Sequence, residues 1–164
     1  MVTRRGLITL VAGLLCSTLA AAPEPIRETR LEIVVRPTEI DGNDHANNAR
    51  YLEWLQWGRD DWYTQKGLTR DLFKRWGVTP VTVNINIDFK RECLQGEALT
   101  IASKIDRMGD KSYAFFQSVR KANGETAAEA VTTLVVMDTA TRKSRAIPDE
   151  MLKVLAPAAE KVQP

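Results

Sequence analysis

The sequence has little cysteine, little histidine and almost no net charge, and each scarcity excludes a class of protein. Its 164 residues hold two cysteines and one histidine, and the formal net charge is +2. Cys16 lies in an N-terminal segment that resembles an export signal, so the remaining chain has Cys93 alone and cannot form an internal disulfide. One histidine among scattered carboxylates gives no metal-ligand spacing, and the charge is too weak for a nucleic-acid surface. We therefore expect no metal, no cofactor and no nucleic-acid partner.

The first 22 residues differ in composition from the rest of the chain. They contain no acidic residue, carry Arg4 and Arg5, and continue in an apolar run that ends in small residues. This is the layout of a secretory leader, and its start loosely fits a twin-arginine export signal. The apolar run is shorter than the roughly 20 residues of a transmembrane helix. We expect a signal-like leader over 1–22 and one domain over 23–164, with an uncleaved anchor or a misassigned start as alternatives.

Beyond the leader, the apolar pattern predicts one long helix and five strands. From Asn47 to Gly67, apolar residues recur at three-, four- and seven-residue steps, as in a helix. Residues 81–90 alternate apolar and polar side chains, so all apolar residues from Val81 to Phe89 are expected on one face of a strand. The other expected strands are 32–35, 98–107, 112–121 and 126–138, and shorter helices are expected over 68–76 and 148–161.

These elements indicate a two-layer α+β fold. Asn123-Gly124 is a strong hairpin signal between two of the strands, and the four strands after the helix are expected to form a meander. The strands are long, so the sheet should coil around the helix. Tryptophans at positions 54, 57 and 62 suggest that the helix is covered on most sides.

Polar residues are concentrated just before the long helix, in the stretch "DGNDHANN" from 41 to 48. Asn47 or Asn48 can cap the helix, because an amide oxygen accepts hydrogen bonds from the free N–H groups of its first turn. Those groups carry a partial positive charge, which can polarise a carbonyl or hold an oxyanion. Asp41 lies a few residues upstream, where its carboxylate could attack such a carbonyl or deprotonate a water molecule. A thioester fits this arrangement, since its thiolate leaves without a strong general acid.

Structural roles are the alternative for each of these residues. Asp41 could close a loop, Asp44 could be a solvated carboxylate, and Asn47 and Asn48 could act only as caps. A lone histidine such as His45 is more often structural than catalytic.

The motif "DGNDHANNARYLE", which starts at Asp41, resembles the signature of hot-dog-fold acyl-CoA thioesterases, in the 4-hydroxybenzoyl-CoA thioesterase-like superfamily. The resemblance is closest to the bacterial long-chain acyl-CoA thioesterase III group, and "VTVNINIDFKRECLQGEALTIASKI" resembles strands of that group. It extends over about residues 30–155. It implies a hot-dog fold, in which a curved antiparallel sheet of about five strands wraps one long helix. It also implies a homodimer or homotetramer with active sites between subunits.

The resemblance also assigns roles to residues. Asp41 would be the catalytic base or nucleophile, His45 and Asn47 would shape the site, and Tyr51 would line it. Backbone N–H groups near His45 to Asn48 would polarise the thioester carbonyl of a medium- to long-chain acyl-CoA or acyl-carrier substrate. The basic residues expected to meet its phosphates are Arg91, Lys111 or Arg120.

Two features depart from the family. Many relatives have glycine before the histidine, where this chain has Asp44. The leader suggests export to the periplasm, whereas the relatives, like coenzyme A, are mostly cytoplasmic. Two other functions stay open: a hot-dog enoyl-thioester hydratase or dehydratase, and a non-catalytic acyl-binding module.

Overall fold

The computed structural model describes residues 28–156, so the leader expected over 1–22 lies outside the described residues. Within them, no helix is both long enough and apolar enough to cross a membrane. In chain order the elements are β1 (Glu28–Val34), the 3₁₀ turn η1 (Pro37–Glu39), α1 (Asn48–Gln65), α2 (Arg70–Trp76), β2 (Val78–Phe89), β3 (Ala98–Met108), β4 (Ser112–Lys121), β5 (Thr126–Asp138) and α3 (Asp149–Leu155).

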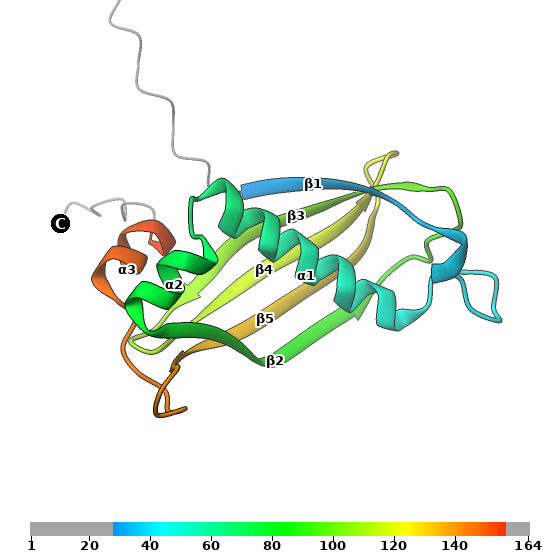
Figure 1. Ribbon diagram of the computed structural model, residues 1–164. Coiled ribbons are helices and arrows are strands. Elements are labelled where there is room, and N and C mark those ends of the chain that lie inside the picture. Colours follow the sequence, from blue (N-terminus) through cyan, green and yellow to red (C-terminus); the bar gives the residue numbers. More distant parts are fainter. Residues whose placement is uncertain (1–27, 157–164) are drawn as a thin grey trace, which may run out of the picture.

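The five strands form one antiparallel sheet in the order β1-β3-β4-β5-β2. Helix α1 lies across one face of this sheet, and α2 and α3 gather at the end of the sheet farthest from the α1 N-terminus (Figure 1). The two-layer α+β fold predicted from the sequence is confirmed. The first strand is longer than predicted, because it begins at Glu28 rather than at residue 32.

The predicted four-strand meander is wrong for β2. Strands β3, β4 and β5 do follow one another, but β2 pairs with β5 at the far edge and β1 takes the place beside β3. The segment 90–97 makes this possible, because it leaves β2 and passes beneath the start of α1. Its path is fixed by hydrogen bonds from Ala46 N–H to the Cys93 carbonyl (2.8 Å) and from Gly96 N–H to the Val35 carbonyl (2.9 Å).

A β-bulge in β2 breaks the predicted alternation of its side chains. The pairing with β5 shifts between Thr82 and Asn84, and Val83 is left without a partner and 58% exposed. A bulge moves all later residues to the opposite face. As a result Ile87 packs on the core side of the sheet, whereas Val81 lies on the other side. The sequence pattern alone could not reveal this extra residue.

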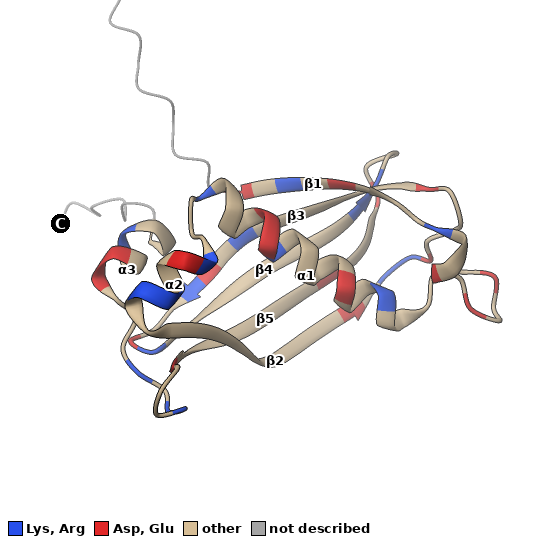
Figure 2. Ribbon diagram, viewed as in Figure 1, with Lys and Arg blue, Asp and Glu red and all other residues tan. Residues whose placement is uncertain are grey.

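Two apolar clusters support α1. Trp54 and Leu55 belong to the cluster near its N-terminus, and Trp62 to the cluster near its C-terminus. The prediction that the helix is covered on most sides does not hold in the single chain, because Leu52 on its outer face is 41% exposed. Figure 2 shows that β5 and the middle of β2, beside the helix, carry few charged residues.

A buried polar belt separates the two clusters. Arg59 is 2% exposed and donates to Gln117 Oε1 (2.8 Å), Thr132 Oγ1 (3.3 Å) and Gln56 Oε1 (2.7 Å). Burial lowers the pKa of Arg59 from its ordinary value. Gly58 lets the helix approach the sheet here, because a Cβ atom at this position would lie 2.7 Å from Ile101 Cγ2.

Candidate active site

The segment between η1 and α1 is closed by a short two-stranded turn. Ile40 and Ala46 form an isolated bridge, and Asp41 N–H donates to the His45 carbonyl (3.0 Å). Asp44 has φ = +63°, the left-handed conformation that glycine favours. Short polar residues such as aspartate tolerate this conformation better than other side chains. Aspartate at position 44 is therefore compatible with the conformation of this turn.

Asp41 is held at the start of α1 by two hydrogen bonds. Its Oδ1 accepts from Asn43 N–H (2.9 Å), and its Oδ2 accepts from the side-chain amide of Asn47 (3.4 Å). The Asp41 side chain is 21% exposed, so solvent still reaches it. Asn47 has a second role, because its Oδ1 caps α1 by accepting from Ala49 N–H (2.9 Å). One asparagine thus links the carboxylate to the helix N-terminus.

Most backbone N–H groups at this end of the helix are already engaged. Asn47 N–H donates to the Glu39 carbonyl, and Arg50 N–H donates to the Asn47 carbonyl (both 2.9 Å). The backbone N–H groups of His45 and Asn48 have no acceptor among residues 28–156. Asn48 also lines the cleft beside Asp41. Oxyanion donors were expected among the backbone N–H groups from His45 to Asn48. Within residues 28–156, only the N–H groups of His45 and Asn48 are free for this role.

His45 and Tyr51 lie along the same cleft but differ in exposure. His45 Nδ1 is 3.8 Å from Asp41 Oδ1 and donates to its neighbouring carbonyl at Ala46 (3.3 Å), and the ring is 36% exposed. Tyr51 is 3% exposed and packs edge-on against Phe89, with ring centroids 5.0 Å apart. Burial, with a hydrogen bond to Cys93, raises the pKa of Tyr51, so its hydroxyl stays protonated.

A cleft of about 500 Å³ joins these groups. Among the residues predicted for the site, Asp41, His45, Asn48, Tyr51 and Arg91 line it. Asn47, which was also predicted, does not line the cleft but donates a hydrogen bond to Asp41. The lining residues that the sequence did not single out are Asn43, Ala46, Phe89, Lys90 and Glu92. Three of these, Phe89, Lys90 and Glu92, lie at the cleft because the end of β2 returns to the polar turn, and only the tertiary fold reveals this return.

Lys111 is not brought to this cleft in the single chain. It precedes β4 in the turn after β3, where its carbonyl accepts from Val136 N–H (2.8 Å). The cleft lies at the other end of the sheet, roughly 30 Å away at about 3.3 Å per strand residue. Arg120 lies near the cleft end of β4, and its Nε donates to Ser118 Oγ (3.1 Å).

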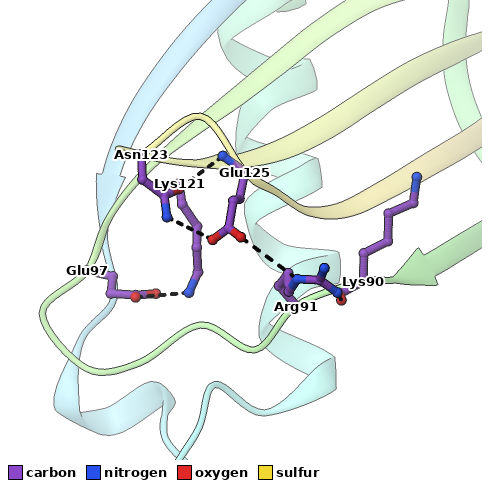
Figure 3. A network of polar contacts seen from close by, with 6 residues as sticks. All are labelled: Lys90, Arg91, Glu97, Lys121, Asn123 and Glu125. Atoms are coloured by element: carbon purple, nitrogen blue, oxygen red, sulfur yellow. Dashed lines mark hydrogen bonds and ion pairs between the residues drawn. The ribbon is translucent and has the colours of Figure 1, made fainter.

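The basic residues beside the cleft belong to a network of polar contacts (Figure 3). Arg91 Nε lies 4.0 Å from Glu125 Oε1, and Lys90 pairs with Glu129. Lys121 Nζ donates to Glu97 Oε1 (3.0 Å), at the end of the 90–97 segment. Each of these cations already has a carboxylate beside it, so an anionic ligand would have to compete for them.

The fold and this cleft together define a class of protein. A carboxylate held at the N-terminus of the long helix, on a five-stranded antiparallel sheet, is suited to attack on a polarised carbonyl. Within the described residues, no group of three or more His, Cys, Asp or Glu side chains could hold a metal ion. One long helix lying on a five-stranded antiparallel sheet is the arrangement of a hot-dog fold.

Comparison with known proteins identifies the family. The chain belongs to the thioesterase-like superfamily, whose profile matches residues 35–155. It is 33% identical over 129 residues to the long-chain acyl-CoA thioesterase FadM of Escherichia coli, covering 76% of this chain and 94% of that protein. The family resemblance predicted from the sequence is confirmed.

Solved structures give the same fold. The probable thioesterase YbaW from Escherichia coli has a TM-score of 0.68 at 32% identity, over 77% of this chain and 95% of that one. The 1,4-dihydroxy-2-naphthoyl-CoA thioesterase Slr0204 from Synechocystis has a TM-score of 0.73 at 17% identity, over 80% of this chain and 97% of that one. The predicted hot-dog fold is confirmed.

Proposed function

We propose that this protein hydrolyses medium- to long-chain fatty acyl-CoA thioesters to a free fatty acid and a thiol. The observation that carries the proposal is the position of Asp41, whose partly exposed carboxylate is held by Asn47, the residue that also caps α1. Similarity to a long-chain acyl-CoA thioesterase over most of the chain supports the substrate class.

The proposed chemistry depends on two groups, the backbone N–H of Asn48 and the carboxylate of Asp41. The thioester carbonyl oxygen would lie at the Asn48 N–H, whose dipole stabilises the negative charge that develops on that oxygen. Asp41 then acts in one of two ways. As a base, it takes a proton from water while the water oxygen bonds to the carbonyl carbon; as a nucleophile, its own oxygen forms that bond and water later hydrolyses the anhydride. In both routes the C–S bond breaks, and the thiolate leaves and takes up a proton.

The acyl chain would lie against the part of the sheet that α1 leaves uncovered. Ile85 and Ile87 lie there on half-buried positions of β2, and Phe89, which lines the cleft, is 50% exposed. An apolar path thus leaves the cleft along β2. Arg91 at the cleft rim would meet an anionic group of the thiol carrier, once that group displaces Glu125 from it.

We further propose that a second copy of the chain completes the site, in a homodimer or homotetramer. Strand β2 is a 12-residue edge strand with one neighbour, and Val83 and Phe89 on it are exposed at 58% and 50%. Long, apolar strand edges of this kind are normally paired or covered. Pairing two β2 edges would bring the apolar path of one chain against the other chain.

A panel of acyl-CoA thioesters of increasing chain length tests the proposed function. The expected result is thiol release with a maximum at medium or long chains, measured with a thiol reagent. An enoyl-CoA in the same panel tests the hydratase alternative, which the closeness of His45 to Asp41 keeps open. Loss of enoyl absorbance without free thiol would support a hydratase, and fatty-acid binding without turnover of any thioester would support a binding module.

A further inference from the structure

Glu39 is a buried carboxylate two residues before Asp41. It is 5% exposed and forms no ion pair with a residue in the range 28–156. A buried carboxylate without a cationic partner is unfavourable unless hydrogen bonds satisfy its oxygens. Both oxygens are satisfied here: Oε2 accepts from the backbone N–H of Arg36 (2.7 Å), and Oε1 accepts from the indole N–H of Trp54 (3.1 Å).

These two hydrogen bonds connect the segment that leads into Asp41 with helix α1, whose N-terminus forms the other part of the site. Arg36 precedes the turn η1, which leads into Asp41. Trp54 lies two turns into α1, is fully buried, and fixes the helix against the sheet. The carboxylate therefore fastens the entry of the Asp41 loop to the body of the helix.

The backbone of Glu39 extends the same connection to the helix tip. Its carbonyl accepts from Asn47 N–H (2.9 Å), and the side-chain amide of Asn47 donates to Asp41 Oδ2 (3.4 Å). The next residue, Ile40, forms the bridge with Ala46 that closes the loop. Glu39 thus contacts the helix at Trp54 and Asn47 and leaves Asp41 little freedom to move relative to either.

We propose that Glu39 is a positioning residue that fixes the distance between the Asp41 carboxylate and the N-terminus of α1. This inference rests on the proposed role of Asp41. Glu39 touches no reacting atom in this account, and it does not line the cleft. Its effect on turnover would arise because a shift of about 1 Å in a reacting group can slow an enzyme by about 100-fold.

Glu39→Gln tests the role with a small change in shape. A glutamine can still accept from Trp54, but its NH₂ group would face the N–H of Arg36, so the two donors would separate. We expect kcat for an acyl-CoA to fall by about 10- to 100-fold with KM within about threefold. Trp54→Phe removes the other bond and should lower kcat in the same way. Glu32→Gln is the control. Among residues 28–156 this exposed β1 carboxylate accepts only from Thr100 Oγ1, so the change should leave kcat unchanged.

Measuring the effect of Glu39→Gln in the Asp41→Asn enzyme separates a positioning role from a general loss of structure. If Glu39 acts through Asp41, adding Glu39→Gln to Asp41→Asn should change the residual rate by less than about threefold. An equal loss in both backgrounds, or a Glu39→Gln enzyme with kcat near that of the parent, would overturn the proposal. Rates are compared at a temperature where circular dichroism shows every variant folded.

If the proposed function itself fails, crystal structures of the wild-type and Glu39→Gln proteins still test the positioning role. In that case wild-type protein and Asp41→Asn would show the same rate, or neither would release thiol. A displacement of Asp41 relative to Asn48 in the Glu39→Gln crystal would then still support positioning. Superimposable Asp41 side chains in the two crystals would refute it.

Discussion

At the scale of single residues, the turn before α1 shows how backbone conformation limits the residue type at one position. Asp44 has a φ of +63°, which is the conformation that glycine adopts at low cost. Aspartate is one of the few other residues that visit this region. The residue type is thus limited by backbone conformation rather than by contacts of the side chain.

This conformation gives a prediction for Asp44. Asp44→Val should destabilise the fold by about 1–2 kcal/mol, because a β-branched side chain clashes with its own backbone at positive φ. Asp44→Gly is the matched control and should differ from the parent by less than about 0.5 kcal/mol. Urea unfolding followed by circular dichroism measures both. Equal stability of the valine and glycine variants would show that the turn relaxes to another conformation.

Asn47 and Glu39 show what could and could not be predicted from single residues. The cap at Asn47 was predictable, because capping depends on local sequence. The role of Asn47 toward Asp41 and the contribution of Glu39 were not, because both depend on how a loop folds back onto the helix. Glu39 has no neighbour in sequence that signals its bond to Trp54, 15 positions away.

At the scale of elements, the contact between α1 and the sheet depends on Gly58. A Cβ atom there would lie 2.7 Å from Ile101 Cγ2 and 2.8 Å from Ser103 Oγ. We therefore expect Gly58→Ala to destabilise the protein by about 1–3 kcal/mol through overpacking, despite the better helix propensity of alanine. Gly42→Ala is the control, since nothing lies within 4 Å of its Cβ position. A stabilised Gly58→Ala variant in thermal unfolding would contradict this packing.

The ion pair between Glu97 and Lys121 fastens the 90–97 segment to the end of β4 (Figure 3). Burial opposes the charge of Glu97, but hydrogen bonds from Leu94 N–H and Lys121 outweigh it, so the pKa of Glu97 lies below its ordinary value. The stability from this depressed pKa is complete above the unfolded pKa of about 4.3 and is lost as the pH falls through the folded pKa.

Lys121→Met should consequently lower stability by about 1 kcal/mol at pH 7. The difference from the parent should shrink as the pH falls below about 4, where Glu97 becomes protonated in both proteins. Urea unfolding between pH 3 and pH 7 measures this. Lys74→Met, which breaks an exposed pair with Asp71, should have little effect at any pH. A constant difference for Lys121→Met across this range would exclude the ion pair as its cause.

At the scale of the whole molecule, the sequence determined the class of fold but not the order of the strands. The long helix and the strands were visible because their periodicities are local. The placement of β2 at the far edge and the bulge at Val83 depend on pairing with β5, which is a tertiary choice. The distance between Lys111 and the cleft of its own chain could not be predicted for the same reason, since it follows from strand direction and not from sequence spacing.

The free edge of β2 gives a prediction about assembly. We expect light scattering coupled to size-exclusion chromatography to give the mass of a dimer or tetramer. Val83→Lys should shift it toward the monomer, because a charge at the centre of an apolar edge opposes pairing. Val34→Lys is the control. Val34 is also 58% exposed, but it lies on β1, the strand at the opposite edge of the sheet. A monomeric parent protein, or equal effects of both variants, would count against pairing through β2.

The most direct test of the account is the turnover of a long-chain acyl-CoA by Asp41→Asn, with Asp44→Asn as the matched control in the same turn. Both variants remove one negative charge, and asparagine tolerates the backbone conformation at position 44. The account predicts that kcat/KM falls by at least about 100-fold for Asp41→Asn and by less than about threefold for Asp44→Asn. An Asp41→Asn enzyme within a few-fold of the parent would contradict it.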